Sequence, residues 1–226
     1  ATHRQSSTGT CSYRLPENSM TKIKVCADPF PPYQYVDKDG SIKGKDYELV
    51  VSRLRAAGYD PEVCIAEWDR IYREFQAGEQ DVLFQAQDSP ERLEKFYFSK
   101  RLRYAVTEIV TINADLLALK EYAGLAGYKV GVIAGFANGP EIDGLPDSCK
   151  VEYPGTAQVL QGIYDKEVDC GVCDQGVKEY LTAGLPVLYP IPALTYKRPL
   201  YVMFNQEKQR DDFDEAGQGQ EEGYDF

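Results

Sequence analysis

The sequence is poor in the residues that most often catalyse reactions and bind metals. Its one histidine, His3, stands near the start of the chain, ahead of the first predicted strand. A Ser–His–Asp triad in the folded body is therefore excluded, and no cluster of metal-ligand residues appears. The phosphate-binding patterns GxGxxG and GxxxxGK[ST] are also absent. We expect no cofactor and no metal, and we do not expect an enzyme.

Long apolar runs and positive charge are scarce too. No run of about 18 apolar residues exists, so the sequence predicts no transmembrane helix. Lys and Arg number 25 against 36 Asp and Glu, which gives a formal net charge of −11. Binding of nucleic acid needs a basic surface, so we expect no nucleic-acid partner. Ala1 is compatible with a signal peptide that has been removed.

The six cysteines are an even set, which favours an oxidising compartment. Cys170 and Cys173 have CxxC spacing, but they lie in a predicted strand, where side chains three apart point to opposite faces. We favour buried thiols or separate structural disulfides over a redox or zinc pair. Cys26 and Cys64 fall on strands that we expect to be neighbours, so they can form a disulfide, while the connectivity stays open.

Strands and helices alternate along most of the chain, which predicts parallel sheets with right-handed crossovers. The pattern occurs twice, which predicts two similar α/β lobes. Strands are predicted at residues 22–27, 62–66, 81–85, 129–133, 150–153, 168–173 and 199–204. Helices are predicted at residues 46–57, 68–77, 137–142, 156–164 and 175–183, with a weaker terminal helix at 211–222.

Two further segments are expected to cross between the lobes, at residues 105–112 and 188–191. Two crossings make the first lobe discontinuous and place a hinge between the lobes. The expected division is an N-terminal arm at 1–19, lobe 1 at 20–108 plus 193–226, and lobe 2 at 109–192. A ligand would then bind in the cleft between the lobes.

Two residues of opposite charge follow equivalent strands of the two lobes. Ser89 is a good N-cap and Pro90 suits the first helical position, so Arg92 lies in the first turn of a helix. Asp174 comes directly after the last strand of lobe 2. Ligands of open α/β sheets bind beyond the carboxyl ends of strands, so the two residues would clamp a zwitterion. The alternatives are an ion pair of Arg92 with a neighbouring glutamate and an N-cap role for Asp174.

Residues 78–99, GEQDVLFQAQDSPERLEKFYFS, resemble the G-x-x-D…T-x-T-x-E-R…F-x-F-S signature of the bacterial extracellular solute-binding proteins, family 3. PPYQYVDKDGSIKGKDYELV resembles the P-P-F…D-G…G-x-D-x-D-L segment of that family. LAGYKVGVIAGF and VDCGVCD resemble the start and the final strand of its second lobe. The matches keep their order across residues 22–204. This resemblance implies two Rossmann-like lobes joined by two crossing strands, the type 2 periplasmic-binding-protein fold.

The resemblance also implies a function. We expect a monomeric periplasmic protein that captures an amino acid or a related small carboxylate by hinge closure. It would deliver this ligand to the membrane permease of an ABC transporter. Two alternatives on the same fold stay open: the sensor domain of a membrane receptor or histidine kinase, and a dehydratase of the cyclohexadienyl or arogenate type.

The same resemblance assigns roles to residues of the cleft. In the family, the arginine at the place of Arg92 pairs with the ligand α-carboxylate, which a guanidinium fork suits. The acidic residue at the place of Asp174 accepts the ligand α-ammonium. Family aromatics stack on the ligand, and this role carries over to Phe30, Tyr33 and Trp68. Core packing is the alternative for Trp68.

The chain departs from the family at both sides of the cleft. Where the family often has glycine and threonine before the arginine, this chain has Gln85 and Gln87. Where the family often has Gly-Thr-Thr in lobe 2, Gly135 is followed by Phe136, Ala137 and Asn138. Two hydroxyl anchors are thus missing, although backbone N–H groups at this helix entry suit an anionic group. We include these residues in the site and expect a modified amino acid or a different small carboxylate as ligand.

Overall fold

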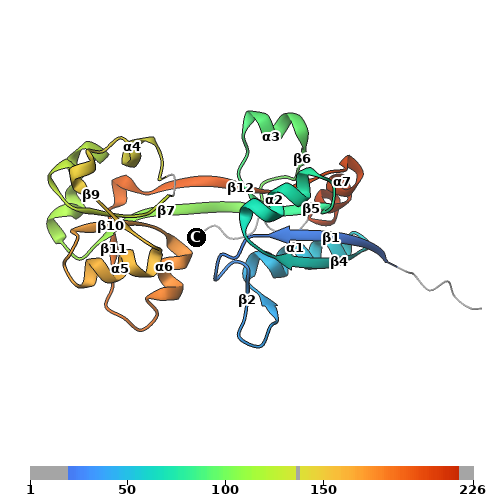
Figure 1. The fold of residues 1–226 in the computed structure, drawn as a ribbon, viewed down its shortest axis with the longest axis horizontal. Helices are drawn as coiled ribbons and strands as arrows, with labels where there is room; N and C mark the ends of the chain where they lie inside the picture. The colour runs from blue at the N-terminus through green and yellow to red at the C-terminus, as the bar shows by residue number, and fades with distance from the viewer. Residues whose placement is uncertain (1–19, 136–137, 219–226) are drawn as a thin grey trace, which may run out of the picture.

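The computed structural model describes residues 20–135 and 138–218. The predicted arm at 1–19 lies outside this range, and so do Phe136 and Ala137. The chain folds into two α/β lobes that lie next to each other along the long axis of the molecule (Figure 1). Two long strands, β7 (Arg103–Thr111) and β12 (Tyr196–Phe204), run from one lobe to the other.

Lobe 1 is built on a four-stranded part of the sheet. The strand order is β4 (Tyr59–Ile65), β1 (Thr21–Ala27), β5 (Val82–Ala86) and β12, with the first three parallel and β12 antiparallel to β5. Side chains of β1 alternate between two faces. Ile23 and Val25 face a core shared with α1 (Lys45–Ala56) and α7 (Glu207–Ala216), whereas Cys26 faces α2 (Trp68–Gln76).

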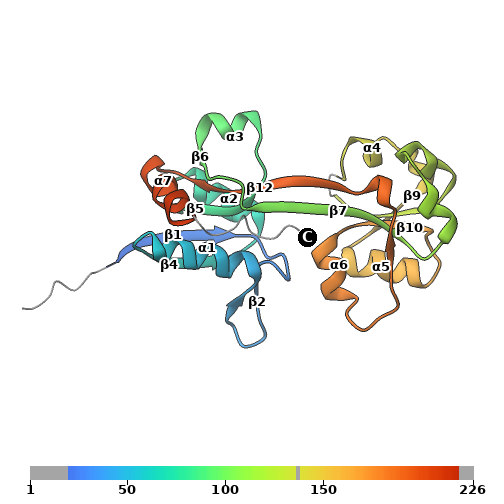
Figure 2. The same ribbon diagram turned by 180° about the vertical axis from the view of Figure 1, so that it is seen from behind.

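Lobe 2 repeats this order. Its strands run β9 (Lys150–Tyr153), β8 (Val130–Ile133), β10 (Cys170–Asp174) and β7, with the first three parallel and β7 antiparallel to β10. α5 (Thr156–Tyr164) and α6 (Gln175–Leu181) cover one face, and Figure 2 shows them on the same side of the long strands as α1. The predicted internal repeat is therefore confirmed as two equivalent half-sheets.

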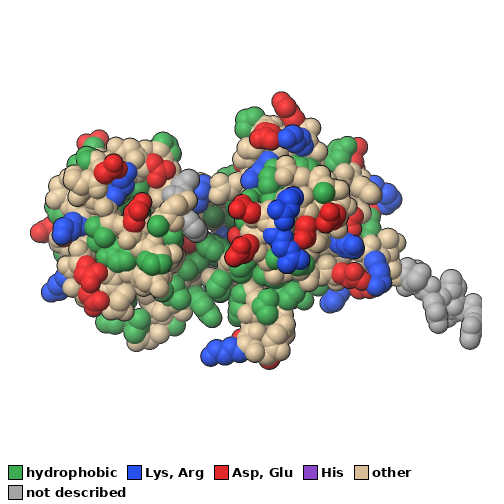
Figure 3. Space-filling view, in the orientation of Figure 1, with side chains coloured by type: hydrophobic (Ala, Val, Ile, Leu, Met, Phe, Trp, Pro, Cys, Tyr) green, Lys and Arg blue, Asp and Glu red, His purple; other side chains and the backbone are tan. Residues whose placement is uncertain are grey.

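Short elements complete both lobes. They are β2 (Tyr35–Val36), β3 (Ile42–Lys43), α3 (Pro90–Lys95), β6 (Tyr97–Phe98), α4 (Pro140–Asp143), β11 (Tyr189–Pro190) and 3-10 turns at Ala114–Ala118, Tyr122–Gly127, Asp147–Cys149 and Pro192–Leu194. Within the described residues, no helix combines the length and the apolar character that a membrane span needs. Positive and negative side chains are intermixed on the face in Figure 3.

Two sequence-based predictions about the strands and helices are wrong. Residues 188–191 do not cross between the lobes, because β11 pairs with the end of β7 inside lobe 2. The return crossing is β12, which pairs with β7 through its first half and with β5 through its second half. The terminal helix begins at Glu207 and ends at Ala216, earlier than predicted, with Gly217 as its C-cap.

The described cysteines form no disulfide. Cys26 and Cys64 are direct partners in the β1–β4 register, as predicted, but both thiols are free. The Sγ of Cys26 instead lies 3.4 Å from the carbonyl oxygen of Val82 on the other neighbouring strand. Cys170 and Cys173 are buried, free thiols, one of the two interpretations favoured for them.

Candidate functional site

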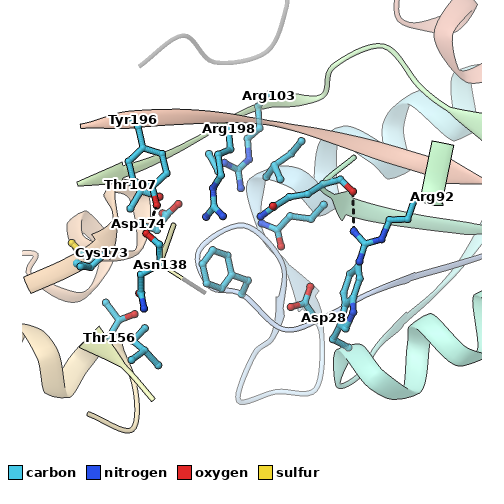
Figure 4. Close-up of a pocket in the computed structure, with 18 residues that line it drawn as sticks. Asp28, Arg92, Arg103, Thr107, Asn138, Thr156, Cys173, Asp174, Tyr196 and Arg198 are labelled. Carbon is cyan, nitrogen blue, oxygen red and sulfur yellow. Dashed lines mark hydrogen bonds between the residues drawn. The ribbon is translucent and has the colours of Figure 1, made fainter. Parts of the chain in front are cut away.

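A cavity of about 410 Å³ lies between the lobes (Figure 4). This volume is in the range of small-molecule sites. The residues that line it are Asp28, Phe30, Trp68, Gln85, Gln87, Arg92, Arg103, Ala105, Thr107, Ile133, Asn138, Thr156, Val172, Cys173, Asp174, Tyr196, Arg198 and Leu200.

The walls of the cavity come from the carboxyl ends of the parallel strands. In lobe 1, Asp28 and Phe30 follow β1, Trp68 opens the helix after β4, and Gln87 follows β5. In lobe 2, residues at the end of β10 and residues at or after the ends of β8 and β9 occupy the corresponding places. Because the two half-sheets have the same order, their carboxyl ends converge on the same cavity.

The floor of the cavity is formed by β7 and β12, the two bridging strands. In their antiparallel register, Tyr196 pairs with Thr107, Arg198 with Ala105, and Leu200 with Arg103. Residues that pair directly point to the same face, and so do residues two apart. All six side chains therefore share one face, and all six line the cavity.

Arg92 lies at one end of the cavity (Figure 4). Ser89 caps its helix by accepting a hydrogen bond from the backbone N–H of Arg92, as predicted. Its guanidinium lies 5.1 Å from the ring centroids of Trp68 and Tyr72, and Nη1 donates to the carbonyl oxygen of Gln87 at 2.8 Å. In the described part of the chain it forms no ion pair with the adjacent glutamates. The rings and the carbonyl orient its side chain while leaving its charge without a carboxylate partner.

Asp174 lies at the other end, on lobe 2 (Figure 4). Its carboxylate accepts a hydrogen bond of 3.0 Å from the backbone N–H of Val177, so it is the N-cap of α6. The same oxygen accepts a hydrogen bond of 2.9 Å from the hydroxyl of Tyr33. The side chain thus caps a helix, one of the two roles considered from the sequence, and it also faces the cavity.

Tyr33 does not line the cavity but connects the lobes beside it. Its side chain is 4% exposed, and its hydroxyl reaches from lobe 1 to Asp174 in lobe 2. Burial and the Asp174 carboxylate raise the pKa of this phenol, so it stays a hydrogen-bond donor. A Cβ atom at Gly176 would lie 2.7 Å from Cζ of Tyr33 and closer still to its hydroxyl. Only glycine fits at that position while the lobes are in this arrangement.

Two arginines of the floor were not identified from the sequence. Arg103 is 3% exposed and pairs with fully buried Asp46 at 2.8 Å. Arg198 is half-buried and, among the described residues, forms no ion pair. The predicted strand began at residue 199, so Arg198 fell outside it. Arg198 could have been identified from the spacing of Tyr196, Arg198 and Leu200, because residues two apart lie on one face of a strand.

Gln85 brings an amide to the cavity with an unusual backbone. Its φ is 63°, in the left-handed region where glycine is favoured, at the place where the family often has glycine. Gln34 donates from its side-chain amide to the side-chain carbonyl of Gln85. The Nε2 of Gln85 is buried and has no protein partner among the described residues. Strained residues of this kind cluster at binding sites.

The other predicted site residues within the described part of the chain also line the cavity, and so does Asp28. Trp68 lines it and at the same time stacks on Tyr72 and packs against the core under α2, so it fits both interpretations. Burial raises the pKa of the Asp28 carboxyl. The backbone carbonyl of Asn138 accepts a hydrogen bond of 2.9 Å from Tyr196. The cavity does contain hydroxyl groups from other elements, since Thr107 and Thr156 line it.

Comparisons with known proteins agree with this architecture. Residues 23–178 match the family of bacterial extracellular solute-binding proteins, family 3. A probable amino-acid ABC transporter-binding protein of Haemophilus influenzae is 28% identical over 184 residues, which are 76% of this chain and 69% of that protein.

Solved structures of binding proteins share the fold. The arginine-, lysine-, histidine-binding protein ArtJ of Geobacillus stearothermophilus superposes with a TM-score of 0.66 at 22% identity, over 87% of each chain. An ancestral cationic amino acid solute-binding protein superposes with a TM-score of 0.71 at 22% identity, over 86% of this chain and 87% of that one. The expected fold, two lobes joined by two crossing strands, is thereby confirmed. The chain belongs to the bacterial extracellular solute-binding proteins, family 3.

Proposed function

We propose that this protein binds an amino acid or a closely related small carboxylate between its lobes and delivers it to the permease of an ABC transporter. One observation carries the proposal. A cation of lobe 1, Arg92, and an anion of lobe 2, Asp174, line the same cavity from opposite ends. Neither charge has an oppositely charged partner among the described residues. A zwitterion between them supplies a partner to each.

In this proposal the guanidinium of Arg92 binds the α-carboxylate through a two-pronged hydrogen bond. Stacking on Trp68 and Tyr72 limits the rotamers of Arg92 before the ligand arrives. Asp174 accepts the α-ammonium with the oxygen lone pairs that Tyr33 and Val177 leave available. Phe30 offers an apolar face in the cavity.

The ligand would also favour closure of the lobes. Each lobe provides one of the two charges, so the ligand gains both contacts only when the lobes are close together. Its contacts therefore stabilise the closed form more than the open form. Rotation about β7 and β12, the segments that bridge the lobes in the described part of the chain, would supply the hinge.

The relatives support the ligand class and the place of action. The Haemophilus protein is named for amino-acid ABC transport, and the ArtJ structure is titled for arginine, lysine and histidine. An extracytoplasmic location, the periplasm, follows from the family. We propose that the protein acts there as a monomer.

A thermal-shift screen over the twenty amino acids and small mono- and dicarboxylates tests the proposal. A ligand at 100 times its dissociation constant stabilises the folded state by about 2.7 kcal/mol, which raises the melting temperature measurably. Isothermal titration calorimetry then compares each hit with its des-amino and its amide analogue. Absence of a shift with every amino acid and every small carboxylate, or indifference of the hits to loss of the α-amino and α-carboxyl groups, contradicts the proposal.

A further inference from the structure

The floor of the cavity carries two arginines that the clamp for an α-amino acid does not use. The clamp of Arg92 and Asp174 accounts for one carboxylate and one ammonium group. Arg103 and Arg198 line the same cavity and have no role in that clamp. Figure 4 shows both side chains extending from the bridging strands toward the cavity.

The register of the bridging strands brings these two arginines close together. Arg103 pairs with Leu200, and Arg198 lies two residues before Leu200 on the same face. Such diagonal neighbours are about 7–8 Å apart at Cα, within reach of long side chains. Asp46 already balances the charge of Arg103, so an anion between the two guanidinium groups is stabilised mainly by the charge of Arg198.

Both arginines also have donors that no protein atom accepts. Nη2 of Arg103 and Nε of Arg198 are buried, and neither has a hydrogen-bond partner among the described residues. Buried donors are satisfied in most native proteins. The two guanidinium groups of the floor therefore have donors that an acceptor of the ligand can satisfy once the side chains adjust to it.

The two guanidinium groups differ in whether a carboxylate pairs with them. Nε of Arg103 donates to both carboxylate oxygens of Asp46, at 3.0 and 2.8 Å, which fixes the guanidinium and partly neutralises it. Arg198 has no carboxylate partner in the described part of the chain, and its guanidinium lies 5.7 Å from the ring centroid of Tyr196. Arg198 therefore supplies the uncompensated charge, and Arg103 supplies an oriented donor.

We infer that Arg103 and Arg198 form a second anion subsite on the floor of the cavity, and that the ligand is an amino acid with a second carboxylate, of the glutamate or aspartate class. This inference rests on the proposed function, since it adds a side-chain subsite to the amino-acid clamp. It also separates this protein from the relatives whose titles name cationic amino acids. A cationic side chain would meet the unpaired charge of Arg198.

Calorimetry with two matched ligand pairs tests the subsite. Glutamate and glutamine have the same shape and differ in one charge, and so do aspartate and asparagine. A charge-assisted hydrogen bond predicts that the acid binds at least about tenfold more tightly than its amide. Arg198→Gln should reduce this acid-to-amide ratio by at least about tenfold, and Arg198→Lys, which keeps the charge, should reduce it less.

Lys197→Gln is the matched control. Lys197 is the next residue on β12, is exposed and points to the opposite face, so its substitution removes the same charge without touching the cavity. The acid-to-amide ratio should stay at the wild-type value in this variant. A melting curve of each variant establishes that it is folded before titration.

The outcomes separate the inference from the proposed function. An acid preference that disappears in Arg198→Gln and persists in Lys197→Gln supports the subsite. Binding of neutral or cationic amino acids with no acid preference overturns the subsite and leaves the amino-acid proposal standing. An acid preference that Arg198→Gln does not change also overturns it. Failure of every amino acid to bind overturns the subsite, and failure of every small carboxylate as well overturns the proposed function.

Discussion

The hydroxyl of Tyr33 donates a hydrogen bond of 2.9 Å to the carboxylate of Asp174, across 141 positions of the chain and from one lobe to the other. Asp174 is also the residue that we propose for the ligand ammonium. In that proposal the same carboxylate takes part in lobe contact and in ligand recognition. Changes to this contact should alter the equilibrium between open and closed forms as well as affinity.

Tyr33→Phe removes only the hydroxyl of this contact. A hydrogen bond to a charged group contributes about 1.5–3 kcal/mol, so the variant should populate open forms more than the wild type does. Small-angle X-ray scattering without ligand should give a larger radius of gyration. Tyr164→Phe is the control, because its hydroxyl donates to the carbonyl of Pro186 within lobe 2. An equal expansion of both variants would argue against a lobe contact.

Gly176→Ala adds one methyl group where Tyr33 leaves no space. The contact between the lobes must open to accommodate it, although each lobe keeps its own core. We expect a larger radius of gyration with saturating ligand and weaker binding, with little change in helix content by circular dichroism. Gly127→Ala is the control, since nothing lies within 4 Å of a Cβ atom there. A compact, tightly binding Gly176→Ala protein would contradict the proposed role of this position.

Arg92→Ala removes the proposed carboxylate anchor. Loss of one partner of a desolvated charge pair typically costs about 2–5 kcal/mol, so binding of amino acids should become undetectable or weaken by orders of magnitude. Lys95→Ala on the same short helix is the control, because Lys95 pairs with Glu91 on the surface. Calorimetry measures both. Unchanged affinity in Arg92→Ala would contradict the proposed contact of Arg92 with the ligand carboxylate.

Asp46→Ala tests the ion pair beneath the floor of the cavity. The carboxylate of Asp46 is fully buried, and its loss leaves the guanidinium of Arg103 buried without a carboxylate partner. Breaking a buried pair from one side destabilises by about 3–5 kcal/mol, which urea unfolding should register. The exposed pair of Asp37 with Lys43 is the comparison, and Asp37→Ala should change stability little. Similar urea midpoints for Asp46→Ala and Asp37→Ala would contradict the expected larger contribution of the buried pair.

The buried thiols make the reactivity of the cysteines depend on folding. Burial raises the pKa of Cys170 to about 12, so almost no thiolate forms at pH 8 in the native protein. Iodoacetamide should therefore label Cys64, the described cysteine that is not buried, well before Cys26, Cys149, Cys170 and Cys173. Peptide mass spectrometry of native and urea-unfolded samples measures this order. Rapid native labelling of Cys170 would contradict it.

The same shift has a consequence for stability at high pH. The unfolded chain loses the thiol proton near the ordinary cysteine pKa of 9.0, whereas the folded chain keeps it until about pH 12. The folded state binds more protons in this interval, so this group contributes less to stability as the pH rises through it. Below pH 9 the contribution is constant.

Local sequence patterns determined most of the fold. The alternation of strands and helices, the Ser89 cap and the repeat of two half-sheets depend on neighbouring residues, and the structure confirms them. Because parallel strands align their carboxyl ends, the positions of Arg92 and Asp174 at one cavity also followed from the sequence. The observed ends of helices and strands differ from the predicted ends by a few residues, since the last residues of an element depend on contacts beyond it.

Only the tertiary structure decided which side chains complete the site. Arg198 faces the cavity because β12 pairs with β7 in one register, and a shift by one residue would turn it outward. Tyr33 looked like a ligand-stacking ring and instead joins the lobes, since its partner Asp174 is distant in sequence. The sequence determined two lobes and their opposite charges through short-range periodicity and capping. Long-range pairing decided the floor and the contact between the lobes, because register and packing depend on residues far apart in the chain.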